Sequence, residues 1–126
     1  MKRLVFLFLL VPTLAVADWQ PLVKEDTLDV HWDPDTLMSR DANRTVLILI
    51  NNLRKTKQDK EASVVAQAEL NCNKRLLRYR GSKSYTDFIG KGAEVSELTT
   101  TKYTTWFVVP HSNYFESALM SNACRN

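Results

Sequence analysis

The chain has 126 residues, with 17 Lys and Arg against 14 Asp and Glu, and two cysteines. This length is enough for one small domain with its own core and too short for two ordinary domains. Two of the 17 basic residues lie in an N-terminal segment that we expect to be removed, which leaves 15 against 14 acidic residues. This near-neutral balance argues against a general nucleic-acid binder, which needs a large excess of basic residues.

Residues 1–17, MKRLVFLFLLVPTLAVA, have the three parts of a secretory signal peptide. Lys2 and Arg3 form a basic start, Leu4 to Val11 form a short apolar run, and a small-residue cleavage site ends at Ala17. The apolar run is far shorter than the ~20 residues that cross a bilayer. We therefore expect an exported periplasmic or extracellular protein of 126 less 17, or 109, residues, with no transmembrane segment in its mature form.

Two strands are predicted in the first half of this mature chain. Apolar residues occupy every second position of 27–32, which is typical of a strand with one face against a core. The branched run at 46–50 is typical of a central strand, and polar residues 41–44 before it favour a turn. Between them, Asp33-Pro34-Asp35 contains two carboxylates that could serve acid and base chemistry, but its composition favours a turn or a helix start.

The clearest alternation in the chain covers residues 62–72, where Cys72 falls on the apolar side and Glu69 on the polar side. Leu77 and Tyr79 follow with the opposite parity. A tight turn or bulge near residues 71–73 is therefore expected to reset the register before a returning strand. The pair is predicted to form an antiparallel hairpin.

The last third of the chain changes from strand to helix. Residues 81–104 are polar with three glycines, and a stretch of this length is expected to contain a short strand. Residues 106–109 predict a last strand that Pro110 ends. After His111 the apolar spacing is helical up to Cys124, and Asn113 with Glu116 resembles a capping box.

The two cysteines predict a disulfide bond, because paired cysteines in a small exported domain are usually oxidised. Cys72 lies on the inward side of its strand, and the helix returns Cys124 to the core. The bond would then join the helix to the sheet. The expected fold class is α+β: a single antiparallel sheet with a C-terminal helix packed on one face, forming one domain over residues 18–126.

The order of these features resembles the surface-adhesin protein E family of small exported proteins of Gram-negative bacteria. The resemblance spans nearly all of residues 18–126 and depends on the order of aromatic, cysteine and turn residues. The matching positions are Trp19, Asp33, Leu37, Val46, Ser63, Cys72, Lys74, Arg75, Gly92, Val95, Trp106, Val109, Pro110 and Cys124.

The resemblance implies a sheet of about six strands with the C-terminal helix on its concave side, held there by the disulfide. It also implies an adhesin that binds host matrix and serum proteins, such as vitronectin and laminin, from the bacterial surface. Members held at that surface carry a lipid-modified cysteine. In this chain Asp18, and not a cysteine, directly follows the expected cleavage site, so we expect no lipobox.

A candidate binding patch lies on the returning arm of the predicted hairpin. Several cations on one edge add their fields and would attract an acidic protein segment, a glycan or lipid headgroups. Charges of this kind also guard exposed strands against edge-to-edge pairing, and that interpretation is favoured here. If the patch binds a partner, replacement of Arg75, Arg78 and Arg80 by serine is expected to weaken capture and to leave the fold intact, because exposed charges contribute little to stability. The patch comprises Lys74, Arg75, Arg78, Arg80 and Lys83.

Three aromatic residues are candidates either for an interface or for the core. Trp32, Tyr79 and Trp106 alternate with polar neighbours, and this periodicity favours packing in the core.

No catalytic or metal-binding motif is visible in the sequence. His31 and His111 lack the spacing of zinc ligands and have no nearby nucleophile motif, so we expect no enzyme, no cofactor and no metal. The leading hypothesis is a binding module that presents a rigid sheet to a host matrix protein or an envelope protein. A periplasmic enzyme inhibitor or immunity protein is the alternative, and a homodimer is left open.

Overall fold

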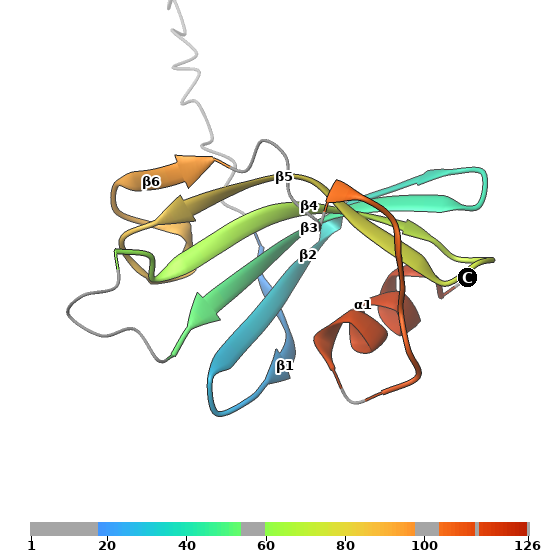
Figure 1. Ribbon diagram of the computed structural model, residues 1–126, viewed down its shortest axis with the longest axis horizontal. Helices are drawn as coiled ribbons and strands as arrows, with labels where there is room; N and C mark the ends of the chain where they lie inside the picture. The colour runs from blue at the N-terminus through green and yellow to red at the C-terminus, as the bar shows by residue number, and fades with distance from the viewer. Residues whose placement is uncertain (1–17, 54–59, 98–103, 113, 126) are drawn as a thin grey trace, which may run out of the picture.

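The structure, a computed structural model, describes residues 18–53, 60–97, 104–112 and 114–125. Within these ranges, seven strands form one antiparallel sheet and one α-helix lies against one of its faces (Figure 1). The elements in chain order are β1 (Gln20–Lys24), β2 (Leu28–Arg40), β3 (Asn43–Asn52), β4 (Ser63–Asn71), β5 (Leu76–Tyr85), the short 3₁₀ helix η1 (Phe88–Gly90), β6 (Glu94–Glu97), β7 (Phe107–Val108) and α1 (Phe115–Ala123).

Strands β1 to β6 lie side by side in chain order, and each pairs antiparallel with the next. Strand β6 pairs with the end of β5, and β7 pairs with its start. The predicted central strand, the hairpin of β4 and β5, and the short strand within 81–104 are therefore confirmed. The sequence did not predict β1, which forms one edge of the sheet.

The Asp-Pro-Asp sequence at 33–35 lies inside β2 and does not end it. The register between β2 and β3 shifts there, which marks a bulge. The backbone N–H of Asp35 donates to Oδ1 of Asp33 at 3.1 Å, forming a local turn. The Thr36 hydroxyl then accepts a hydrogen bond from the backbone N–H of Leu47 at 2.9 Å. This side chain takes the place of a backbone acceptor, so the strand continues beyond the proline.

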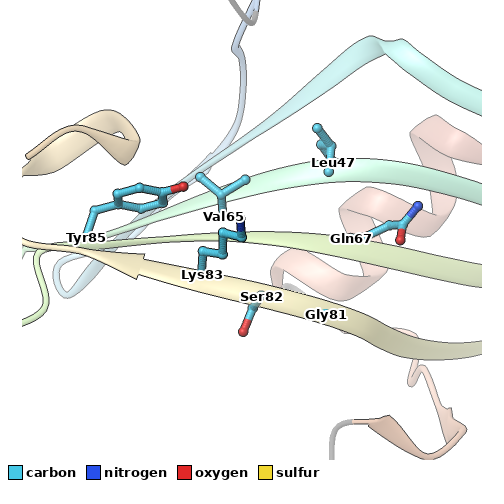
Figure 2. A pocket seen from close by; sticks show the side chains of 7 residues that line it. All are labelled: Leu47, Val65, Gln67, Gly81, Ser82, Lys83 and Tyr85. Carbon is cyan, nitrogen blue, oxygen red and sulfur yellow. The ribbon is translucent and has the colours of Figure 1, made fainter. Parts of the chain in front are cut away.

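Successive residues of a strand point to opposite faces of the sheet, and the two faces here have different surroundings. Val46 and Ile48 of β3 contribute to the core beneath α1. Leu47, between them, and Val65 of β4 lie on the other face, with α1 behind the strands in Figure 2. We call the surface opposite α1 the open face.

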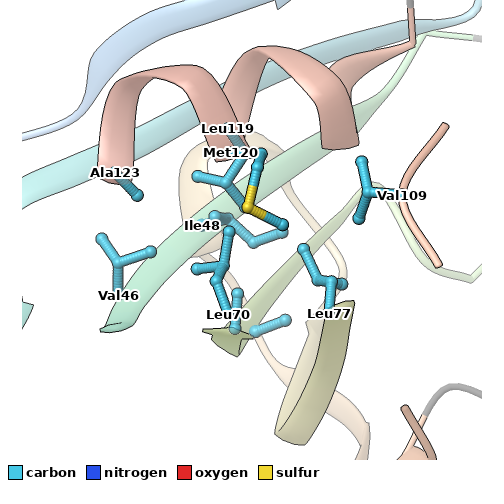
Figure 3. Close-up of a cluster of buried hydrophobic side chains, with 10 residues drawn as sticks. Val46, Ile48, Leu70, Leu77, Val109, Leu119, Met120 and Ala123 are labelled. Atoms are coloured by element: carbon cyan, nitrogen blue, oxygen red, sulfur yellow. The ribbon is translucent and has the colours of Figure 1, made fainter. Parts of the chain in front are cut away.

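The hydrophobic core lies between the sheet and α1 (Figure 3). It combines alternate residues of β3, β4 and β5 with the inner face of the helix. Each fully buried aliphatic side chain contributes roughly 1.5–3 kcal/mol relative to exposure. The buried members are Val46, Ile48, Ala66, Ala68, Leu70, Leu77, Val109, Leu119, Met120 and Ala123.

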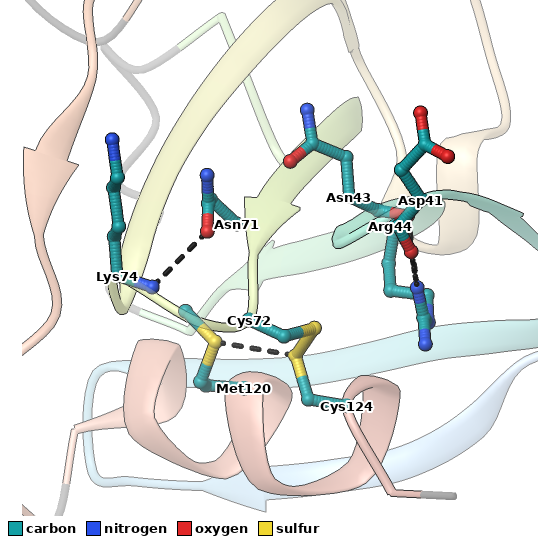
Figure 4. The surroundings of a disulfide bond; sticks show 8 residues. All are labelled: Asp41, Asn43, Arg44, Asn71, Cys72, Lys74, Met120 and Cys124. Atoms are coloured by element: carbon teal, nitrogen blue, oxygen red, sulfur yellow. Dashed lines mark hydrogen bonds between the residues drawn. A yellow bond between two sulfur atoms is a disulfide. The ribbon is translucent and has the colours of Figure 1, made fainter.

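The predicted disulfide between Cys72 and Cys124 is present, with 5.7 Å between the Cα atoms (Figure 4). It joins the turn after β4 to the end of α1, where Cys124 is the C-terminal cap. Sγ of Cys124 also contacts Sδ of Met120 at 3.4 Å, so the bond packs against the core.

The helix begins after Tyr114, which provides no side-chain cap. The expected capping residue Asn113 lies outside the described residues. In the described part of the chain, no helix has the length and apolar character needed to cross a membrane.

Candidate protein-binding surface

The turn between β4 and β5 places the first two residues of the predicted basic patch. Arg75 has a φ of 52°, a left-handed conformation that reverses the chain. The Asn71 side chain accepts a hydrogen bond from the backbone N–H of Lys74 at 3.1 Å. Lys74 itself is exposed at this turn, so its ammonium group faces solvent.

Arg75 points back to the segment that follows β7. Its Nε donates to the carbonyl oxygen of Val109 at 3.3 Å, and its own carbonyl accepts from the N–H of Val109 at 2.8 Å. These contacts fix the end of β7 beside the start of β5. Arg75 therefore has a structural role, in addition to any part that it takes in binding.

Arg78 and Arg80 converge on a single carboxylate, that of Glu69 in the neighbouring strand β4. Arg78 approaches Oε1 of Glu69 with its Nη2 at 2.7 Å and its Nε at 3.0 Å, and Nη1 of Arg80 lies 3.3 Å from Oε2. The Glu69 side chain is only 7% exposed, whereas those of Arg78 and Arg80 are 33% and 55% exposed. Two guanidinium groups thus compensate one buried negative charge.

Trp106 completes this arrangement from the segment before β7. Its ring lies 4.5 Å from the guanidinium carbon of Arg78, a cation–π contact that covers the cation. We call these four residues the Glu69 cluster: Glu69, Arg78, Arg80 and Trp106.

The structure distributes the predicted patch along β5 and does not gather it at one point. Lys83 pairs with Val65 in the sheet register and is exposed on the open face. At ~3.3 Å per strand residue, Lys83 lies roughly 17 Å from Arg78. Arg78 is paired and partly covered, Arg80 is paired but exposed, and Lys74 and Lys83 are exposed. The interpretation that these charges guard an exposed strand stays a prediction, and the structure adds the pairing of Arg78 and Arg80 with Glu69.

A groove on the open face was not predicted from the sequence. It has a volume of about 240 Å³ and lies across β3, β4 and β5. Its walls come from three consecutive strands, whose side chains meet only through the register of the sheet. One sequence feature marks it, a glycine in the middle of a strand. The lining residues are Leu47, Val65, Gln67, Gly81, Ser82, Lys83 and Tyr85 (Figure 2).

Next to the groove, the loop that contains η1 folds back over the open face. Two buried side chains hold it: Asn51 accepts from the N–H of Ile89 at 2.9 Å, and the hydroxyl of Ser63 accepts from the N–H of Gly90 at 2.9 Å. The Ser63 hydroxyl also donates to the carbonyl of Asp87 at 2.6 Å. These bonds hold Ile89 at a φ of 62°, which is unfavourable for a β-branched residue. No sequence pattern predicts these hydrogen bonds, because the residues that they join lie 24 to 38 positions apart in the chain.

The three candidate aromatic residues divide between the two faces. Trp32 and Tyr79 pack against the core as predicted, and the rings of Tyr79 and Phe107 lie 6.3 Å apart. Trp106 differs from the prediction, because its ring packs on Arg78 of the Glu69 cluster. Among the described residues, no group of three His, Cys, Asp or Glu side chains could hold a metal ion.

Comparison with known proteins identifies the family. The model of the family described as surface-adhesin protein E matches residues 19–125. A search of curated protein sequences finds no match. One crystal form of Haemophilus influenzae protein E is similar with a TM-score of 0.64 at 17% identity, covering 90% of this chain and 91% of that chain. Protein E from non-typeable Haemophilus influenzae has a TM-score of 0.59 at 14% identity, with 89% and 79% covered.

One antiparallel sheet, a helix on one face and a disulfide between them define a small cross-linked α+β domain. The family match covers nearly all of this domain, and the chain belongs to the surface-adhesin protein E family. The resemblance inferred from the sequence is confirmed. The structural likeness at these low identities supports the fold alone.

Proposed function

We propose that this chain is an adhesin-type binding module that contacts an acidic segment of a protein partner with the open face of its sheet. The family supports the adhesin role. The choice of face depends on one observation: the Glu69 cluster fixes two guanidinium groups on the side that α1 leaves uncovered. Side chains that are already fixed lose little conformational entropy when a partner binds.

The charge of this region supports an acidic partner. Arg78 and Arg80 carry two positive charges against the one buried carboxylate of Glu69, and Lys74 and Lys83 are exposed farther along the same hairpin. The Glu69 cluster therefore carries one net positive charge. A positive surface of this kind accelerates encounter with acidic partners and is weakened by salt.

We also infer that the protein is exported and acts in the periplasm or at the cell surface. The basic start, the apolar run and the small-residue site at residues 1–17 support cleavage after Ala17. The intact mass of the exported protein is expected to correspond to a chain that begins at Asp18. A mass that still includes Leu4 to Val11 would contradict the cleavage.

An experiment on the role of positive charge in binding must leave Arg78 and Arg80 in place. Their loss would also leave the Glu69 carboxylate buried without a partner. Lys74 and Lys83 are exposed, so their replacement changes the charge and leaves the core untouched. A matched control removes two exposed charges elsewhere, at Lys24 of β1 and Arg40 of β2.

The variant Lys74→Gln/Lys83→Gln is expected to capture its partner from envelope extract about fivefold less well, as two exposed charges contribute up to ~1 kcal/mol each. Raising the salt concentration is expected to weaken capture by the parent more than by this variant. The readout is the amount of the enriched protein in quantitative mass spectrometry, with thermal melting to verify the fold.

The control variant Lys24→Gln/Arg40→Gln is expected to capture within about twofold of the parent, because its charges lie away from β5. Equal capture by both double variants at low and high salt would overturn the proposed surface. If the captured protein is an envelope hydrolase whose activity falls on binding, the chain is an inhibitor and not an adhesin.

A further inference from the structure

Gly81 lies beside the bulge of the β4–β5 pairing, and the packing around it does not require a glycine. It lies inside β5 opposite Gln67, and its φ is not positive, unlike those of Gly90 at 66° and Gly92 at 82°. A Cβ atom added at Gly81 would meet nothing within 4 Å. Glycine in a strand interior lowers stability and often marks a bulge or a place where another molecule approaches closely. The effect of this glycine is to leave the groove open.

The groove has the size and lining of a site for one side chain. Its volume of about 240 Å³ is below the ~300–1,000 Å³ of pockets that hold drug-sized ligands. Leu47 and Val65 provide aliphatic carbons, and Tyr85 forms one end (Figure 2). A large apolar side chain would cover these carbons and remove them from water.

Positive charge borders the groove. Lys83 is one of its lining residues and lies opposite Glu97 of β6 in the sheet register, and Arg80, with a side chain 55% exposed, directly precedes Gly81. The negative charge of Glu69 does not offset them at the surface, since its side chain is 7% exposed and paired with two guanidinium groups. A segment that enters the groove is therefore favoured when its neighbouring residues are acidic.

An apolar rim extends the groove toward the η1 loop. The position of a Cβ at Gly90 lies 3.0 Å from Cγ2 of Val65 and 3.9 Å from the ring of Tyr85, so the loop packs directly against the groove wall. Phe88 and Ile89 of this loop are 46% and 51% exposed. Hydrogen bonds to the buried side chains of Asn51 and Ser63 hold the loop in place. The loop therefore loses little conformational entropy when a partner contacts these apolar groups.

We propose that the groove receives one large apolar side chain of a partner segment whose flanking residues are acidic. This inference rests on the proposed protein-binding function and specifies the partner's chemistry at the same surface. The apolar residue supplies the anchor, and the acidic residues face Lys83 and Arg80. Anchors of this kind in small pockets dominate many protein interfaces.

The test uses nuclear magnetic resonance of the ¹⁵N-labelled protein with three pentapeptides blocked at both ends: EEFEE, EEAEE and KKFKK. EEFEE is expected to shift the amide signals of Val65, Gly81 and Lys83 in a saturable way. Loss of the phenyl group in EEAEE is expected to weaken binding at least about tenfold, the effect of burying one aromatic side chain. Reversal of charge in KKFKK is expected to abolish binding.

The variant Gly81→Trp is expected to fill the groove and weaken EEFEE binding by about twentyfold, because the new ring occupies the anchor's place. The control Met38→Trp adds the same ring to a residue 70% exposed on β2, and it is expected to bind like the parent. Gly81→Leu is the second blocking variant, with thermal melting to show that each variant is folded.

Three results with the peptides would overturn the groove proposal: equal shifts with EEAEE, no saturable shifts with EEFEE, or unchanged EEFEE binding in a folded Gly81→Trp or Gly81→Leu variant. Self-association of the parent that Gly81→Trp removes would identify a second copy as the occupant and would also overturn it. The envelope capture assay separates the two proposals. If Gly81→Trp captures like the parent while Lys74→Gln/Lys83→Gln does not, the protein-binding function stands and the groove proposal fails.

Discussion

Replacement of Cys72 and Cys124 by serine is expected to lower the free energy of unfolding by about 4 kcal/mol, as predicted from the chain entropy of the loop that the bond closes. The sequence separation is 52 residues, so the bond restricts nearly half of residues 18–126. A domain of this size has only ~5–15 kcal/mol in total, and the variant would be near the limit of stability.

Helix α1 is the element that this loss affects most. It has nine residues, which is too short for a stable isolated helix in water. Its buried residues Leu119, Met120 and Ala123 complete the core, so a detached helix would expose the inner face of the sheet. Amide exchange in α1 is therefore expected to increase more than in β3 or β4.

Urea unfolding of the parent and of the Cys72→Ser/Cys124→Ser variant measures this effect. Reduction of the parent is the matched control and is expected to give the same loss, because it breaks the bond without a substitution. A loss below about 1 kcal/mol in both experiments would show that the disulfide does not hold the helix to the sheet.

Loss of both arginines from the Glu69 cluster is the second large effect. The variant Arg78→Ser/Arg80→Ser is expected to lose about 3 kcal/mol of stability, because it leaves a carboxylate buried without a cation. Arg80→Ser alone is expected to lose less than ~1 kcal/mol, since its side chain is half exposed and Arg78 still compensates Glu69. The double variant should therefore lose more than the two single variants together.

A third substitution separates charge from packing in this experiment. Adding Glu69→Gln to the double variant removes the buried charge and is expected to restore part of the lost stability. Urea unfolding measures the stability lost in each of the four variants: Arg78→Ser, Arg80→Ser, the double variant and the triple variant. A double variant as stable as the parent would show that Glu69 is not effectively buried, and failure of Glu69→Gln to restore any stability would assign the loss to packing on Trp106.

The sequence predicted those parts of the fold that depend on periodicity. The alternation in residues 62–72 gave the correct inward side for Cys72 and the outward side for Glu69. The helix was predicted from its apolar spacing. Strand β1 was missed because it is a short, half-exposed edge strand with Pro21 and little alternation. The extent of β2 was missed because the hydroxyl of Thr36 replaces a backbone hydrogen-bond acceptor.

The proposed binding surface was less accessible to sequence reasoning. The basic residues were identified, but their pairing with Glu69 depends on the register of β4 against β5, which aligns Glu69 with Arg78. A bulge near Arg80 then brings a second guanidinium to the same carboxylate. The support of the η1 loop by Asn51 and Ser63 is likewise a tertiary contact. Periodicity gives the face of a residue, but not its partners across strands.

A lysine footprint of the captured complex tests most directly whether the open face along β5 is the binding surface. Amine acetylation with mass spectrometry compares each lysine in the free and the bound protein. Lys74 and Lys83 are expected to be protected several-fold in the complex, because a bound segment excludes the reagent. Lys24, on β1 at the other edge of the sheet, is expected to react at its free rate. Protection of Lys24 with free reaction at Lys74 and Lys83 would contradict the proposed surface.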